Sequence, residues 1–248
     1  MSRVAIELIP RDTESLNTDL ALLRQIAPEV ETINLPDLLR LPLRSWEGAA
    51  LARNHGYTAI PHIRAIDIAP EAPLPCAEQE GIGEVLVIAG DPPPDATHRT
   101  WPNSSAQIIA RYRREAPHLT VYAAFDPYRR APWQELEDLK QKRDAGAAGF
   151  FTQPLFDQRM FELSASWLEK DRVFWGISPV IGPKSRAYWE RVNHVVFPHD
   201  FDPSLDANLA FARRILTEIR ARGEDAYLMP LRVALDSYLG PLSDLLRG

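Results

Sequence analysis

Polar side chains with catalytic potential recur along this 248-residue sequence, each at or near the end of a short apolar run. Glu7 interrupts the run VAIEL, where a carboxyl group is unusual among apolar side chains. Asp91 directly follows the run EVLVIAG, at the start of a Pro-rich loop. The complete set of such residues is Glu7, Asn34, His62 with Arg64 and Asp67, Gly90-Asp91, Asp126, Thr152-Gln153, Ser178 and Arg232.

Each of these residues also has a purely structural explanation. Glu7 could be an internal ion-pair partner, and His62 could be a hydrogen-bonded core histidine. Asp91 could cap the turn before Pro92-Pro93, since Gly-Asp-Pro is common in loops. Gln153 could bridge layers of the core through its amide. The functional interpretation therefore depends on whether the fold gathers these residues at one place.

The apolar runs alternate with amphipathic segments, a pattern typical of repeated strand–helix units. The predicted strands cover residues 4–8, 30–35, 57–63, 84–90, 119–125, 148–153, 173–180 and 226–231. Predicted helices cover residues 12–26, 45–55, 105–115, 132–145, 157–170, 188–192 and 205–222, and a last helix closes the chain. We therefore expect eight strands, each followed by helical sequence.

Repeated units of this kind form parallel sheets with crossover helices. Eight units in 248 residues favour a closed (β/α)8 TIM barrel, with residues 1–248 as a single domain because no linker or low-complexity tract interrupts them. A doubly wound α/β sheet is the alternative, but neither G-x-G-x-x-G after the first strand nor G-x-x-x-x-G-K-[ST] is present. In a barrel, the strand-end residues meet at one mouth, where TIM-barrel active sites lie.

Composition narrows the classes of partner. The formal net charge of −6 gives no general basic surface for nucleic acid, and Arg111, Arg113 and Arg114 are expected on a solvated helix face. No run approaches the length of a membrane span and no cleavage site follows the start, so we expect a cytoplasmic protein. Cys76 has no partner for a disulfide, and the six histidines lack metal-ligand spacing, so no metal site is expected.

Several segments resemble the methylenetetrahydrofolate reductase family, in the same order, from about residue 4 to residue 240. They are VAIELIPRDTESL, IPHIRAID, VLVIAGDPP, LKQKRDAGAAGFFTQPLFD and WGISPV. The resemblance implies that Glu7 protonates N10 of methylenetetrahydrofolate as the imidazolidine ring opens. It implies that Asp91 stabilises the resulting 5-iminium cation and that Gln153 holds the pterin. Glu7 should then have a raised pKa, so that it keeps a proton near neutrality.

Further site residues follow from the same resemblance and from position at the strand ends. Asn34 and Arg232 are expected to bind substrate. The expected cofactor-binding residues are His62, Gly90, Ala124, Phe125 and Lys142. The expected small-molecule partners are a folate and a nicotinamide nucleotide. The sequence does not specify the oligomeric state or the choice between NADH and NADPH.

The family's cofactor is FAD, but several of its contact positions differ here. Ala89 replaces an arginine, Phe125 replaces a tyrosine, and Asp138 and Gln141 replace an asparagine and an arginine, whereas Lys142 is retained. Pro183, or a residue near it, takes the place of the family's substrate-stacking phenylalanine. Two arrangements are compatible with this pattern: direct hydride transfer from NAD(P)H without flavin, or a flavin held by other residues such as Arg129 and Arg130. The first is favoured.

The leading hypothesis is therefore an NAD(P)H-dependent oxidoreductase that reduces 5,10-methylenetetrahydrofolate to 5-methyltetrahydrofolate. One alternative is a non-catalytic folate- or flavin-binding barrel that serves as a subunit of a methyl-transfer complex. Retention of Glu7 argues against it, because binding alone needs no proton donor. A conventional FAD enzyme is the third possibility.

Overall fold

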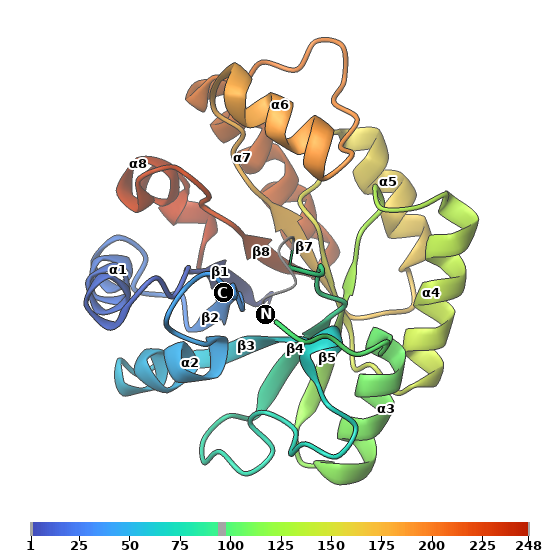
Figure 1. Ribbon diagram of the computed structural model, residues 1–248. Helices are drawn as coiled ribbons and strands as arrows, with labels where there is room; N and C mark the ends of the chain where they lie inside the picture. The colour runs from blue at the N-terminus through green and yellow to red at the C-terminus, as the bar shows by residue number, and fades with distance from the viewer. Residues whose placement is uncertain (1, 94–97, 248) are drawn as a thin grey trace.

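A computed structural model describes residues 2–93 and 98–247, and its strands form a closed parallel barrel in chain order, with β1 pairing with β8 (Figure 1). This confirms the predicted (β/α)8 architecture. The strands are β1 Val4–Glu7, β2 Thr32–Leu35, β3 Thr58–Arg64, β4 Glu84–Ile88, β5 Thr120–Phe125, β6 Phe150–Thr152, β7 Val173–Ile177 and β8 Asp225–Leu228.

The helices surround the strands as an outer layer (Figure 1). They are α1 Thr13–Ile26, α2 Ser45–Asn54, α3 Ser105–Glu115, α4 Pro132–Asp144, α5 Gln158–Trp167, α6 Gly182–Val192, α7 Leu205–Arg222 and α8 Leu235–Leu239. Side chains at their starts satisfy exposed backbone N–H groups, as Asp12 does for α1 and Ser104 for α3. Gly223, in the left-handed conformation, ends α7.

Alternation along the strands divides the apolar residues into two layers. One set fills the barrel interior: Ala5, Ile60, Leu86, Tyr122, Phe151, Phe174, Tyr227 and Met229. The other set faces outward and packs beneath the helices, as Ile6, Val85 and Phe125 do. The interior is therefore a packed core, and TIM-barrel active sites lie at its C-terminal end.

One strand–helix unit departs from the prediction. No α-helix follows β3, which leads into the short 3-10 turn η1 Ala65–Asp67 and a loop that reaches residue 83, between α2 and α3 in Figure 1. Three prolines at positions 70, 73 and 75 disfavour a helix there. The side chain of Asn103 fixes the loop by donating to the carbonyl oxygens of Ala65 at 3.1 Å and Ile68 at 2.6 Å. After β7 the chain forms both α6 and α7, where helices were predicted at residues 188–192 and 205–222.

Several strands end earlier than the sequence pattern suggests. The predicted strands 84–90, 173–180 and 226–231 end at Ile88, Ile177 and Leu228. The residues beyond these points leave the ladder and become the loops of the C-terminal mouth. Asp91 and Ser178 therefore lie on loop backbone rather than on strands, and their positions depend on loop contacts.

Close approach of β6 and β7 requires glycine at position 176. A Cβ there would collide with the carbonyl oxygen of Thr152 and lie 2.8 Å from that of Gln153. We expect Gly176→Ala to lower the free energy of unfolding by about 2 kcal/mol, because backbone must move to admit the methyl group. Chemical denaturation measures this loss. Gly83→Ala is the matched control, since a Cβ at Gly83 meets no atom within 4 Å; equal stability of the two variants would contradict the packing argument.

Candidate active site

A pocket of about 460 Å³ opens at the C-terminal end of the barrel, where the ends of most of the strands and the loops that follow them meet. It is lined partly by apolar side chains, among them Leu86, Ile88 and Phe151. Seven of the ten predicted site residues line it: Glu7, His62, Gly90, Asp91, Ala124, Lys142 and Gln153. The fold therefore brings together residues that are up to 146 positions apart in the chain.

Glu7, the last residue of β1, is enclosed by the barrel and keeps a partly exposed surface toward the pocket. Burial raises the pKa of its carboxyl from 4.5 to about 7, and a hydrogen bond from the Tyr227 hydroxyl to Oε2 acts in the opposite direction. This confirms the elevated pKa expected from the apolar strand. Near neutral pH the group exchanges readily between acid and carboxylate, as a proton donor must.

His62 lies on β3 and reaches the pocket as a neutral imidazole. Burial lowers its pKa from 6.5 to about 3. The amide nitrogen of Asn34 lies 3.2 Å from Nε2, which the neutral ring uses as an acceptor, so the ring proton is on Nδ1. Asn34 itself is completely buried and does not line the pocket. The structure therefore shows Asn34 in contact with His62, which does line the pocket, and a contact of Asn34 with substrate stays a prediction.

The loop after β4 carries Gly90 and Asp91 to the rim of the pocket. Gly90 has a φ of +83°, and a Cβ there would lie 3.0 Å from Ile66, so the position favours glycine. Arg64 fixes the loop by donating to the carbonyl oxygen of Asp91 at 2.6 Å and to the carboxylate of Asp67 at 2.8 Å. The Asp91 carboxylate is 80% exposed and pairs with Arg129 at 2.9 Å.

Gln153 follows β6 directly, and its backbone N–H donates to the carbonyl oxygen of Phe125 at 2.7 Å. The preceding Thr152 is anchored from the other side, since its Oγ1 accepts the N–H of Gly176 at 2.8 Å. These contacts hold the Gln153 side chain at the pocket wall. An amide there can both donate to and accept from a planar heterocycle.

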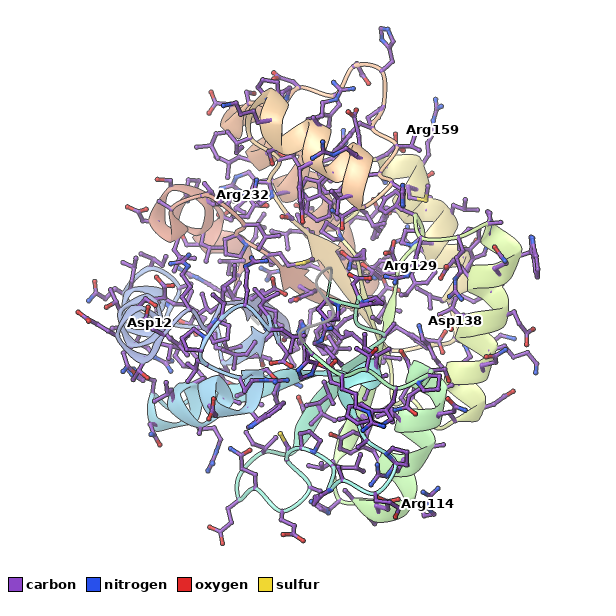
Figure 2. The ribbon with its side chains drawn as sticks, viewed as in Figure 1. Asp12, Arg114, Arg129, Asp138, Arg159 and Arg232 are labelled. Atoms are coloured by element: carbon purple, nitrogen blue, oxygen red, sulfur yellow. The ribbon has the colours of Figure 1, made fainter. Side chains whose placement is uncertain are left out.

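The cations on the α4 side of the pocket are paired with carboxylates. Lys142 Nζ donates to the carbonyl oxygen of Ala124 at 2.6 Å and lies 2.5 Å from Asp138. Arg130 lies 2.6 Å from Glu135 and 3.1 Å from Asp138. Figure 2 shows Arg129 and Asp138 on the same side of the barrel.

These pairs decide how well the pocket suits a flavin. Among its described lining residues, six carboxyl groups (Glu7, Asp37, Asp91, Asp126, Glu135 and Asp138) accompany four cations (Arg64, Arg129, Arg130 and Lys142). Each of the four cations already has a carboxylate partner. A diphosphate is bound through charge-assisted hydrogen bonds from cations, and here it would have to displace carboxylates from them. Neither the retained Lys142 nor the alternative candidates Arg129 and Arg130, paired in this way, therefore fit an FAD diphosphate.

Two predicted site residues lie away from the pocket. Phe125 faces outward from β5, where its ring packs edge-on against Trp167 with centroids 6.2 Å apart. Phe125 therefore does not line this pocket, whereas the neighbouring Ala124 does. Arg232 is exposed, has a φ of +56° and places its guanidinium 5.0 Å from the ring centroid of Tyr188 (Figure 2). Arg232 is not among the residues that line the pocket, so its contact with substrate stays a prediction.

Tyr227 and Asp126 are pocket residues that were not assigned a role from sequence. Tyr227 lies on β8 and is 3% exposed. The β1–β8 register pairs it with Ala5, one inward-facing position below Glu7, and its long side chain reaches up to the carboxyl group. Strand alternation in YLMPL could have placed Tyr227 in the interior, but nothing in the sequence links it to Glu7. Asp126 follows β5, and burial raises the pKa of its carboxyl.

Residues 2–93 and 98–247 provide no candidate for a metal centre or for a membrane-spanning helix. No group of three or more His, Cys, Asp and Glu side chains in these ranges is arranged to hold a metal ion. None of the helices in the same ranges has the length and apolar character needed to cross a membrane.

Comparison with known proteins connects this geometry to a family. No curated protein matches the chain by sequence. A solved structure of an uncharacterized protein from Clostridium thermocellum, which binds two copies of 5-methyl-5,6,7,8-tetrahydrofolic acid, has a TM-score of 0.69 at 9% identity and covers 99% of this chain and 95% of its own. A 2,3-dimethylmalate lyase of the PEP mutase/isocitrate lyase superfamily has a TM-score of 0.57 at 14% identity, covering 99% and 80%. At these identities the likeness shows the barrel fold alone.

A family model gives the more specific result. The model of methylenetetrahydrofolate reductase matches residues 47–208, a range that includes His62, Gly90-Asp91, Lys142 and Gln153 and begins after Glu7. This range is more than half of the chain. The chain therefore belongs to the methylenetetrahydrofolate reductase family.

Proposed function

We propose that the chain reduces 5,10-methylenetetrahydrofolate to 5-methyltetrahydrofolate with a hydride taken directly from NAD(P)H. Family membership supports a folate-related function. The observation that carries the finer proposal is Glu7, a carboxyl with a pKa of about 7 on the wall of the pocket. A site that only binds folate has no need of a buried acid poised to give up its proton. The folate bound by the structurally similar Clostridium thermocellum protein is the product of the proposed reaction.

The reaction would begin with proton transfer. Glu7 donates its proton to N10, the bond between N10 and the methylene carbon breaks, and the electron pair of that bond remains on N10. The lone pair of N5 then forms a double bond to the methylene carbon, giving a 5-iminium cation. Asp91, held at the rim by Arg64 and Arg129, is the carboxylate assigned to stabilise this cation. Gln153 is assigned to the pterin edge, where its amide matches the ring's donors and acceptors.

Hydride transfer completes the reaction. C4 of the dihydronicotinamide delivers a hydride to the iminium carbon, which becomes the methyl group while the nucleotide is oxidised. The paired cations of α4 support a mechanism without resident flavin, because they leave no ready site for an FAD diphosphate. A co-substrate that leaves in every cycle needs only micromolar to millimolar affinity, so a nicotinamide nucleotide makes weaker demands on the same cations.

An absorbance spectrum of the purified protein, followed by addition of NADH and methylenetetrahydrofolate, tests the proposal. We expect no flavin bands, and NADH oxidation that requires the folate. Flavin bands near one equivalent would contradict direct transfer and support a conventional FAD enzyme. A colourless protein that binds folate without consuming NADH or NADPH would instead support the non-catalytic subunit of a methyl-transfer complex.

A further inference from the structure

Tyr227 is held rigidly inside the barrel next to the residues of the site. Its ring packs edge-on against Phe151, with centroids 5.2 Å apart and an interplanar angle of 85°. His62 lies on another side of the ring at a centroid distance of 6.4 Å. With 3% of its surface exposed, the side chain has little freedom to move. Its hydroxyl is therefore directed at one fixed point, the Oε2 atom of Glu7.

The hydrogen bond between these residues has a defined direction. Burial and the adjacent carboxyl raise the pKa of the Tyr227 phenol well above 10, so the phenol keeps its proton and acts as the donor. Oε2 of Glu7 is therefore occupied as an acceptor in both protonation states. The dissociable proton of Glu7 must then be carried by Oε1, the oxygen that Tyr227 does not hold.

Other titratable groups near Glu7 contribute little to its acidity. His62 faces the same pocket from β3 but is neutral over the working pH range. The charged groups that line the pocket from β3, from the loops after β4 and β5, and from α4 have partners other than Glu7. They are Arg64, Asp91, Arg129, Arg130, Glu135, Asp138 and Lys142. Asp37 pairs with Arg44, and Asp126 accepts from the backbone of Tyr128. Burial and Tyr227 therefore remain as the two influences on Glu7.

We propose that Tyr227 is a positioning residue for the proton transfer: it holds Oε2 of Glu7, directs the proton on Oε1 toward the substrate, and stabilises the carboxylate that remains after the proton has left. This inference rests on the proposed function, since it assigns Glu7 as the acid. No proton leaves Tyr227 during the step. The phenol hydrogen bond strengthens as negative charge develops on the carboxylate, which lowers the barrier to donation.

Tyr227→Phe tests the proposal because it removes the hydroxyl and keeps the ring. Since protonated Glu7 is the active form, kcat/KM of the wild type should fall as the pH rises past about 7. In Tyr227→Phe we expect this inflection to move upward by about one pH unit, because the carboxylate has lost its donor while burial remains. The plateau of kcat at lower pH should fall roughly five- to tenfold, since a weaker and less well-oriented acid donates more slowly.

Tyr122→Phe is the matched control. Tyr122 is also a buried interior tyrosine, but it does not line the pocket, and its hydroxyl accepts from Arg172 at 3.3 Å. We expect its pH inflection to match that of the wild type. A loss of activity in Tyr227→Phe at all pH values with an unmoved inflection would show a merely structural role and overturn the proposal.

A second measurement separates this inference from the proposed function. The pKa of Glu7 can be read in the absence of turnover from the carbon-13 resonances of labelled glutamate side chains, assigned with Glu7→Gln. A wild type without reductase activity would contradict the proposed function, whereas an upward movement of the Glu7 pKa in Tyr227→Phe would still support the contact. An unchanged Glu7 pKa in Tyr227→Phe would overturn the inference even in an active enzyme.

Discussion

Replacing Glu7 with Gln should lower kcat by a factor of about 10² to 10⁴, the usual contribution of a general acid. Gln has nearly the same shape and can still accept the hydrogen bond from Tyr227, but it cannot give a proton to N10. Because the pocket keeps its form, binding of 5-methyltetrahydrofolate should change by less than about threefold. Steady-state assays with methylenetetrahydrofolate and NADH, together with calorimetric titration of the product, measure both quantities.

Glu115→Gln is the control for this experiment. Glu115 ends α3 in an exposed position, pairs with Arg111 and Arg114, and does not line the pocket. Its variant should retain wild-type turnover. If Glu7→Gln kept more than a tenth of wild-type kcat, Glu7 would not be the proton donor and the mechanism would need another acid.

The same substitution should stabilise the fold at alkaline pH by about 3 kcal/mol. The pKa of Glu7 is raised from 4.5 to about 7, so between these pH values the folded chain holds a proton that the unfolded chain has released. Folding therefore becomes less favourable as the pH rises through this window, at about 1.4 kcal/mol per pH unit, and the full penalty is present above pH 7. Gln carries no charge and avoids that penalty.

Urea unfolding of wild type and Glu7→Gln at pH 8 and pH 5 measures this difference. At pH 5 the gain should shrink to less than about 1 kcal/mol, because pH 5 lies only slightly above the pKa of 4.5 that Glu7 has in the unfolded chain. The buried neutral His62 destabilises the fold in acid, but it does so equally in both proteins and cancels from the comparison. A variant that is no more stable than the wild type at pH 8 would show that Glu7 is not held in a desolvated site.

Much of the site could be predicted because barrel topology converts strand ends into neighbours. Glu7 interrupts an apolar strand, and His62, Asp91 and Gln153 follow or end other strands, so an eight-stranded barrel places them at one mouth. This prediction required only the number of strand–helix units and the parallel direction of their strands. Neither depends on loop conformation, which explains why the position of these residues at one mouth could be predicted.

The structure departs from the predicted site at residues whose position depends on side-chain direction or on contacts between distant parts of the chain. The segment AAF in β5 is apolar on both faces, so its sequence does not show whether Ala124 or Phe125 faces the pocket. The side chain of Asn34 contacts His62, and the sequence does not show whether such a strand-end residue contacts a ligand or a neighbouring side chain. Arg232 lies beyond the end of β8 at a positive φ, where strand alternation no longer applies. The Tyr227–Glu7 contact joins residues 220 positions apart.

Transfer of deuterium from NADH to the folate tests the central claim most directly. The protein would be incubated in ordinary water with methylenetetrahydrofolate and NADH that carries two deuterium atoms at C4, and the product would be analysed by mass spectrometry. Direct hydride transfer predicts 5-methyltetrahydrofolate with one deuterium in nearly every methyl group. Product without deuterium would mean that the hydride passes through a carrier that exchanges with water, and the absence of 5-methyltetrahydrofolate would contradict the reductase assignment itself.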